Sequence, residues 1–214
     1  MDLKLHGYWR STAAYRVRIA LALKGLDARR AAIDLRKAEQ SAAAYLAINP
    51  QGLVPALEVD GRVLTQSLAI IEWLEEVFPD PPLLPSDPWG RAHVRAMASI
   101  IASDIHPLNN LRVLQHLRTD LALPETAVTA WIAEWVTRGF EAIEALLPER
   151  GWSFGDQPGL ADCCLIPQVY SAQRFGVDLS PFPRIRRIAA LALEHPAFAA
   201  AHPSRQPDAD PAAT

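Results

Sequence analysis

The chain of 214 residues contains only two cysteines, Cys163 and Cys164. They are adjacent within an apolar, helix-like segment, which is a poor arrangement for a disulfide or for a metal site. The six histidines show no ligand spacing with one another or with the cysteines. We therefore expect buried, inert thiols and no bound metal.

The sequence also lacks long apolar runs and an excess of positive charge. No window approaches the roughly 18 apolar residues of a membrane span, and no apolar stretch of a secretion signal follows Lys4. The formal net charge is −3, so no basic face is available to nucleic acid or to an anionic membrane. These absences predict a cytoplasmic protein whose partner is a small molecule or another protein.

The first 80 residues alternate between strand and helix patterns. Strands are expected at 3–8, 31–35, 56–59 and 62–65, and helices at 12–24, 40–47 and 66–77. Gly25 is expected to end the first long helix, and the dipeptide Asp60-Gly61 favours a two-residue hairpin turn. The order β-α-β-α-β-β-α predicts a four-stranded mixed sheet with helices packed on it, which is the thioredoxin-like arrangement.

The rest of the chain is predicted to be helical. Five prolines lie between residues 79 and 88 and indicate a linker. We therefore place one domain at 1–80, the linker at 81–88 and an all-helical domain at 89–214. Helices are expected over 88–117, 125–147, 159–175 and 183–194. Pro107 and Pro167 should bend the helices that contain them, and residues 203–214 should pack as an extended tail or fray.

Two short segments suggest a site for a peptide-like ligand. In NPQGLVPALEVDG, Pro55 stands between a turn and a strand and follows the β-branched Val54, so we expect a cis peptide there, although trans is the commoner form. The backbone of Val54 would then be open to pairing with a peptide. Gln66 and Ser67 begin the next helix, whose positive end favours a carboxylate, and helix capping is the alternative. A ligand with a peptide backbone and a free carboxylate would use both segments.

Six sequence blocks match one known family in the right order. They are YWRSTAAYRVRIALALKG at 8–25, NPQGLVPAL at 49–57, QSLAIIEWLEE at 66–76, DIHPLNNLRVL at 104–114, LADCCLIPQVYSAQRFGVDL at 160–179 and HPSRQPD at 202–208. The chain resembles the zeta class of cytosolic glutathione transferases, the maleylacetoacetate and maleylpyruvate isomerases. The resemblance covers residues 3–207. It implies a thioredoxin-like domain followed by an all-α domain, glutathione as cofactor and a homodimer.

The resemblance assigns contacts with glutathione to residues of both domains. These are Gln40, Gln51, Val54, Gln66, Ser67, His106, Asn110 and Arg112. The pKa of a free thiol, about 8.5, must fall by one to two units to give a useful thiolate at neutral pH. A hydroxyl donor and the N-terminal end of the helix over 12–24 can lower it. Ser11 is the first candidate for this donor and Thr12 the second, and one of the two is expected to cap the helix.

Arg10 and Arg174 suit a substrate with two acidic ends. The zeta-class resemblance implies a maleyl compound with terminal carboxylates, and a planar guanidinium binds a carboxylate through two hydrogen bonds. For Arg174 the alternative is a favourable contact with the end of its own helix. The implied reaction is addition of the glutathione thiolate, rotation about the resulting single bond and elimination to the trans isomer, with Arg10 assisting.

The pattern departs from the family at two positions. Ala13 replaces the cysteine of the usual Ser-Ser-Cys run, so chemistry that needs a protein thiol is in doubt. Gly159 replaces the usual hydroxyl cap before Ala-Asp, for which we expect a small loss of stability. We predict isomerisation of maleylacetoacetate in tyrosine breakdown. The sequence leaves open maleylpyruvate in gentisate breakdown, a conjugating transferase or peroxidase, and a non-catalytic interaction module.

Overall fold

The computed structural model describes residues 1–210, which form two compact units. Unit 1 combines Met1–Leu83 with the chain from Leu193 onward, and unit 2 spans Leu84–Ala192. The C-terminal part of this division differs from the domain expected over 89–214. Helix α9 (Pro196–Ala201) buries Phe198 and packs against the first helix of the chain, so it belongs with the N-terminal sheet.

Unit 1 is built on a four-stranded mixed sheet, as predicted, and its strands lie in the order β2-β1-β3-β4. Strand β1 (Leu3–Gly7) is parallel to β2 (Arg29–Ala32) and antiparallel to β3 (Ala56–Val59). Strand β4 (Arg62–Thr65) completes a hairpin with β3. Asp60 and Gly61 both have positive φ values, of 46° and 82°, as the expected two-residue hairpin turn requires.

Strand β2 begins two residues earlier than the predicted strand over 31–35. Its register pairs Arg29 with Lys4 and Ala32 with Gly7 at the edge of the sheet. Three of its four residues are exposed. A mostly exposed edge strand lacks the apolar alternation by which half-buried strands are recognised, and this explains the shift.

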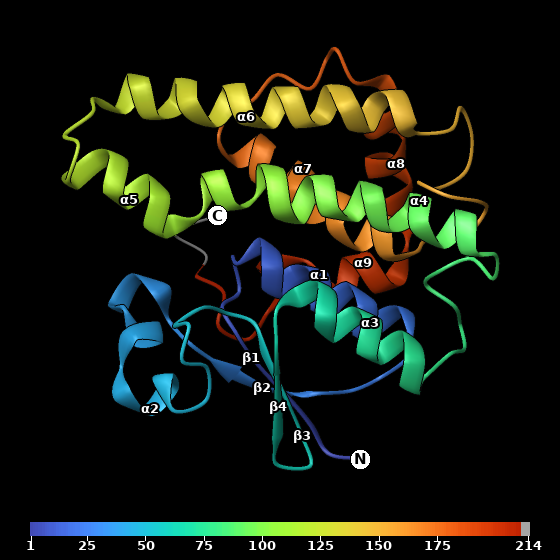
Figure 1. Ribbon diagram of the computed structural model, residues 1–214, viewed down its shortest axis with the longest axis horizontal. Coiled ribbons are helices and arrows are strands. Elements are labelled where there is room, and N and C mark those ends of the chain that lie inside the picture. Colours follow the sequence, from blue (N-terminus) through green and yellow to red (C-terminus); the bar gives the residue numbers. More distant parts are fainter. Residues whose placement is uncertain (211–214) are drawn as a thin grey trace. The chain divides into compact units, whose positions relative to one another are not determined.

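The helices of unit 1 cover the sheet. Helices α1 (Thr12–Leu23) and α3 (Ser67–Val77) lie side by side on one side of it, with α9 against α1, while α2 (Ala43–Leu46) lies away from them (Figure 1). Helix α1 is buried continuously from Thr12 to Leu21, in agreement with its largely apolar circumference. Gly25 ends it with a φ of 65°, as predicted.

A buried ion pair joins the end of α1 to α3. The Lys24 side chain is 0% exposed, and its Nζ donates to Glu75 Oε2 at 2.6 Å. The same Nζ donates to the carbonyls of Phe78 and Pro81 at 2.6 and 2.8 Å, and the N–H of Leu83 donates to Glu75 Oε2 at 2.8 Å. One ammonium group therefore ties two helices to the proline-rich segment that follows them.

Unit 2 is helical, as expected. It contains α4 (Pro88–Ser99), α5 (Leu111–Thr119), α6 (Glu125–Leu146), α7 (Leu160–Arg174) and α8 (Pro183–Glu194), whose last two residues belong to unit 1. Helix α4 packs against α7, in which Cys163 and Cys164 are both 0% exposed. Within residues 1–210, no helix has the length and the apolar character needed to cross a membrane.

The single helix expected over 88–117 is interrupted. After α4 the chain forms wide π-helical turns at Ile100–Ile105 and a 3₁₀ turn at Pro107–Asn109 before α5 begins. Pro107 has no N–H for the helical ladder, and its ring conflicts with the preceding turn. Asn110 then starts α5 by accepting the N–H of Arg112 at its Oδ1 atom, at 3.2 Å.

Asp162 anchors the start of α7 beneath Gly159. Its carboxylate accepts the N–H of Gly159 at 2.9 Å and both the N–H and the hydroxyl of Ser153, at 3.0 and 2.7 Å. Burial raises the pKa of Asp162, while these hydrogen bonds oppose the increase.

Pro167 lies inside α7. The last four residues of the predicted tail, 211–214, lie outside the described part of the chain.

We expect Lys24→Met to lower the free energy of unfolding by about 3–5 kcal/mol, because it leaves the Glu75 carboxylate buried without its cation. Urea denaturation of the variant and the parent chain measures this difference. Lys37→Met is the matched control, since the Lys37 side chain is 71% exposed. Equal stability of the two variants would contradict a structural role for the buried pair.

Candidate active site

Ser11 lies at the N-terminus of α1, directly after a tight turn. The turn runs from Tyr8 to Ser11 and is closed by a hydrogen bond from the Ser11 N–H to the Tyr8 carbonyl at 3.0 Å. The Ser11 Oγ accepts the N–H of Ala14 at 3.2 Å and so caps the helix. A hydroxyl that accepts through a lone pair keeps its own hydrogen for donation. Capping therefore leaves Ser11 able to donate to a bound thiolate.

Thr12 is the first residue of α1 and is only 8% exposed, whereas Ser11 is half-buried. The hydroxyl nearer to solvent is better placed to meet a ligand. This difference favours Ser11 over Thr12 as the donor, the order expected from the sequence.

A network around the carbonyl of Leu53 supports the Val54 segment. The Tyr45 hydroxyl donates to the Leu53 carbonyl at 2.7 Å, and Asn49 Nδ2 donates to the same oxygen at 2.6 Å. Asn49 Oδ1 in turn accepts the N–H of Gln51 at 3.1 Å. The Val54-Pro55 peptide is cis, as predicted. Sequence reasoning found the turn at Asn49 but missed Tyr45, whose partner comes eight residues later in the chain.

Gln66 and Ser67 lie at the N-terminal end of α3, where Gln66 precedes the helix and Ser67 is its first residue. Gln66 has a φ of 68°, which is uncommon for a residue other than glycine and occurs often at functional positions. Its Nε2 donates to Gln51 Oε1 at 2.7 Å, so the structure brings together two of the predicted ligand contacts. The N-terminal end of this helix carries partial positive charge and unsatisfied N–H groups, which favour a carboxylate.

Arg16 lies beneath the start of α3 and was not identified from the sequence. It is 2% exposed on α1, and its Nη1 donates to Ser67 Oγ at 3.2 Å. This bond occupies a lone pair of the hydroxyl and leaves its hydrogen for an outside acceptor. The guanidinium also adds a full positive charge to the one end of α3 that already favours anions. The sequence alone shows Arg16 only as one of two arginines in a largely apolar helix.

Gln40 lies close to the turn that carries Gln51. A Cβ atom added at Gly52, which has a φ of 64°, would lie 3.2 Å from the Gln40 carbonyl oxygen. The Gln40 Oε1 atom is buried and has no hydrogen-bond partner among residues 1–210. The structure therefore places an unsatisfied acceptor close to the turn that carries Gln51.

These groups of unit 1 fit the chemistry of a small peptide. They provide a hydroxyl donor at one helix end, a second helix end for a carboxylate, a backbone segment at Val54 and polar side chains between them. A tripeptide with a thiol, such as glutathione, has a functional group for each of these positions. The residues present are therefore suited to hold it.

The remaining predicted residues have defined places within their own units. In unit 1, the Arg10 guanidinium lies over the Trp9 ring at 5.2 Å. In unit 2, Arg174 is the last residue of α7 and lies over the Phe175 ring at 4.4 Å. The interrupted segment between α4 and α5 carries His106 and Asn110, and Arg112 lies in the first turn of α5.

We expect the stability of the protein to depend on Tyr45 at alkaline pH. Burial raises the pKa of Tyr45 to about 12, so the folded state keeps a neutral phenol above the ordinary value of about 10. The contribution is complete below pH 10 and is lost as pH rises towards 12. By pH 11 the parent chain should lose about 1.4 kcal/mol more than Tyr45→Phe, relative to pH 8. Denaturant unfolding at both pH values measures this, and parallel losses would contradict it.

Comparison with known proteins gives the family. Residues 10–77 match the model of the glutathione S-transferase N-terminal domain, and residues 125–199 match that of the C-terminal domain. The maleylacetoacetate isomerase of Pseudomonas aeruginosa is 55% identical over 96% of this chain and 98% of its own.

Two solved structures have closely similar folds. The holo structure of a bacterial zeta-class maleyl pyruvate isomerase has a TM-score of 0.95 and 52% identity, over 97% of this chain and 100% of that one. The maleylacetoacetate isomerase of Anaeromyxobacter dehalogenans, with glutathione in its active site, has a TM-score of 0.88 and 47% identity, over 98% of both chains. The chain therefore belongs to the glutathione S-transferase family, within the zeta class of maleylacetoacetate and maleylpyruvate isomerases.

Proposed function

We propose that this chain catalyses the glutathione-dependent cis–trans isomerisation of maleylacetoacetate to fumarylacetoacetate. The observation that carries the proposal is the hydroxyl of Ser11 at the N-terminus of α1, directly after Arg10. The kinship with maleylacetoacetate isomerase, at 55% identity, supports the choice of reaction. A non-catalytic interaction module would have no need of this arrangement.

Glutathione, when bound, supplies the thiolate that adds to the maleyl double bond and leaves after rotation. The protein must lower the pKa of that thiol by one to two units, at about 1.4 kcal/mol per unit. A hydrogen bond from Ser11 to a charged acceptor contributes about 1.5–3 kcal/mol, and the N-terminal end of α1 adds about 0.3–1 kcal/mol. Together they cover the requirement without a protein base.

The remaining contacts of unit 1 would hold the peptide part of the cofactor. The Ser67 hydroxyl, with Arg16 behind it, would donate to a carboxylate at the N-terminal end of α3. The backbone of Val54 would pair with the peptide as an added strand. Gln40, Gln51 and Gln66 would satisfy the other polar groups. Thr12 is the second candidate for the contact with the sulfur.

Arg10 and Arg174 are proposed to bind the two carboxylates of the substrate. Bidentate pairing with a guanidinium is both strong and directional, and it would orient the double bond for attack. Positive charge at Arg10 would also stabilise negative charge that develops beside the ketone. We assign His106, Asn110 and Arg112 to the lining of the same site, on the basis of the zeta-class block that contains them.

Maleylpyruvate is the second candidate substrate, because the structure with a TM-score of 0.95 belongs to a maleyl pyruvate isomerase. Both compounds present the same cis double bond between acidic ends. Conjugation or peroxide reduction would use the same thiolate. Reactions that need a protein thiol are disfavoured, since Ala13 replaces the usual cysteine and both cysteines of the chain are 0% exposed.

We also propose a cytoplasmic homodimer that acts in aromatic catabolism, such as tyrosine degradation. Membership in the zeta class supports this assembly and this pathway.

The purified chain should accelerate loss of maleylacetoacetate well above the rate with glutathione alone, followed by ultraviolet absorbance. Ser11→Ala should lower kcat about 10- to 100-fold, because it removes a hydrogen bond to a charged group. Thr12→Val tests the competing donor and should change kcat less. No acceleration by the parent chain would exclude the proposed reaction, and a larger loss for Thr12→Val would reverse the assignment. Parallel assays with maleylpyruvate decide between the substrates.

Arg10→Leu and Arg174→Leu should each raise the KM for the dicarboxylate substrate about tenfold or more, because each removes a bidentate ion pair. The KM for glutathione should stay within about twofold of the parent value. Arg62→Leu is the matched control, since Arg62 is exposed on an edge strand of the sheet. Steady-state kinetics in both ligands measures the effect. A KM for the substrate that matches the control would argue against a role for that arginine in binding.

A further inference from the structure

The sequence block HPSRQPD, at residues 202–208, has no role in the proposed reaction, yet it forms most of a segment that is held by several contacts. We call residues 202–210, which follow α9 in unit 1, the C-terminal strap. Gln206 is 9% exposed, and its Nε2 donates to the carbonyls of Ala200 and His202 at 3.1 and 2.9 Å. The His202 ring meets the Tyr15 ring edge-on at 6.0 Å. The strap is therefore fixed against α1 and α9.

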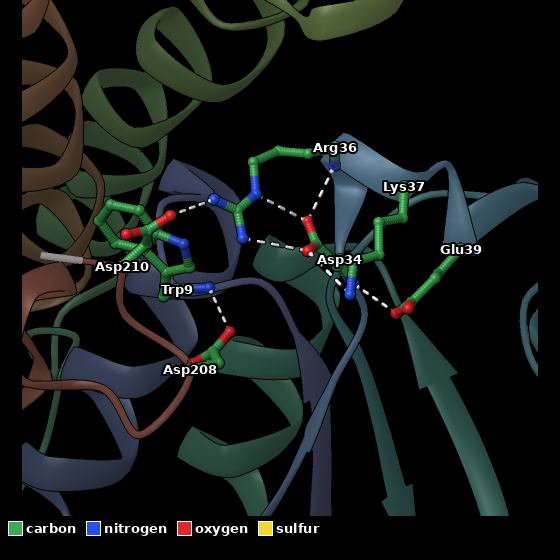
Figure 2. Close-up of polar contacts among 7 residues, drawn as sticks. All are labelled: Trp9, Asp34, Arg36, Lys37, Glu39, Asp208 and Asp210. Carbon is green, nitrogen blue, oxygen red and sulfur yellow. Dashed lines mark hydrogen bonds and ion pairs between the residues drawn. The ribbon is translucent and has the colours of Figure 1, made fainter. Parts of the chain in front are cut away.

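The strap reaches the turn that precedes α1. Asp208 Oδ2 accepts the backbone N–H of Trp9 at 2.9 Å, across 199 positions of sequence (Figure 2). The carbonyl of Trp9 accepts a hydrogen bond from Arg18 Nη2 at 2.9 Å. Both polar backbone groups of Trp9 thus have charged partners. Such charge-assisted hydrogen bonds are roughly twice as strong as neutral ones.

Further contacts hold the end of the strap and the last residue of α9, which directly precedes it. Asp210 Oδ2 lies 2.6 Å from Arg36 Nη1, and Arg36 also donates to both carboxylate oxygens of Asp34, at 3.0 and 3.1 Å (Figure 2). Near the start of the strap, Arg18 Nε donates to the carbonyl of Ala201 at 3.0 Å. Asp208 therefore lies between two anchored points.

The turn presents the residues proposed for catalysis. Trp9 is followed directly by Arg10 and Ser11, and the Ser11 N–H closes the turn on Tyr8. A thiol-activating hydroxyl must lie within hydrogen-bond reach of the sulfur, and a misplacement of about 1 Å can cost about 100-fold in rate. A loop that carries such a group needs outside contacts to fix it.

We propose that Asp208 is a positioning residue, whose carboxylate fixes the Tyr8–Ser11 turn and thereby aims the Ser11 hydroxyl at the sulfur of bound glutathione. Asp208 acts through the backbone of Trp9 and touches no reacting atom. The inference rests on the function proposed above. It assigns a catalytic consequence to the C-terminal block, which lies at the opposite end of the sequence.

The first test uses the protein without glutathione. Asp208→Ala should accelerate hydrogen exchange of the Trp9 amide about 10- to 100-fold, because it removes a hydrogen bond to a charged acceptor. Asp208→Asn keeps a neutral acceptor and should give an intermediate rate. Arg205→Ala is the matched control, since Arg205 is an exposed charged residue of the same strap. Equal protection of Trp9 in all four proteins would overturn the proposal.

The second test measures the pKa of the bound thiol by ultraviolet difference absorbance across pH, together with kcat. Asp208→Ala should raise this pKa by about 0.5–1 unit and lower kcat about threefold to tenfold at neutral pH, with Asp208→Asn between it and the control. If Asp208 had a merely structural role, its variants would have a lower unfolding midpoint but the same pKa of the bound thiol as the control. That result would overturn the proposal. If Asp208→Ala does not fold, the Asn variant decides by the same criterion.

The two proposals fail in different ways. If the parent chain does not lower the pKa of the glutathione thiol, the proposed function is wrong. If the parent chain lowers it and neither Asp208 variant shifts it, only the positioning role is wrong.

Discussion

The buried guanidinium of Arg18 constrains the part of unit 1 on which the site depends. Arg18 is 3% exposed, and its nitrogens donate to backbone carbonyls of Tyr8, Trp9 and Ala201. A charge removed from water is tolerated only when its donors are satisfied, so these carbonyls must be in place for the unit to be stable. The turn before α1, helix α1 itself and the end of α9 consequently fix one another.

The candidate site obtains positive charge from the N-terminal ends of two helices and not from a cluster of basic side chains. Ser11 opens α1, Ser67 opens α3, and Arg16 connects the two helices through Ser67. The positive ends of the helices provide localised charge for a thiolate and a carboxylate. In the proposed function, these helix ends let a chain with a net charge of −3 bind two anionic groups within one small unit.

Periodicity and turn chemistry predicted most of the fold because they are local properties. The hairpin at Asp60-Gly61 was placed correctly, since its turn requires positive φ at residues that tolerate it. The predicted strand over 31–35 begins two residues later than the observed strand β2, because an exposed edge strand carries no apolar alternation. The helix over 88–117 was drawn too long. Pro107 indicated a bend, but the length of the irregular segment depends on how its turns pack.

The sequence by itself determined the order of elements, the zeta-class resemblance and the identity of the groups that can do chemistry, since these depend on residue types and their spacing. Only the tertiary structure decided that Tyr45 supports the carbonyl before Val54, that Arg16 lies under Ser67, and that the C-terminal strap returns to Trp9. Two of these contacts involve a backbone atom, which every residue shares, and the third joins side chains that are 51 positions apart in the sequence. No pattern of side chains along the chain can therefore identify them.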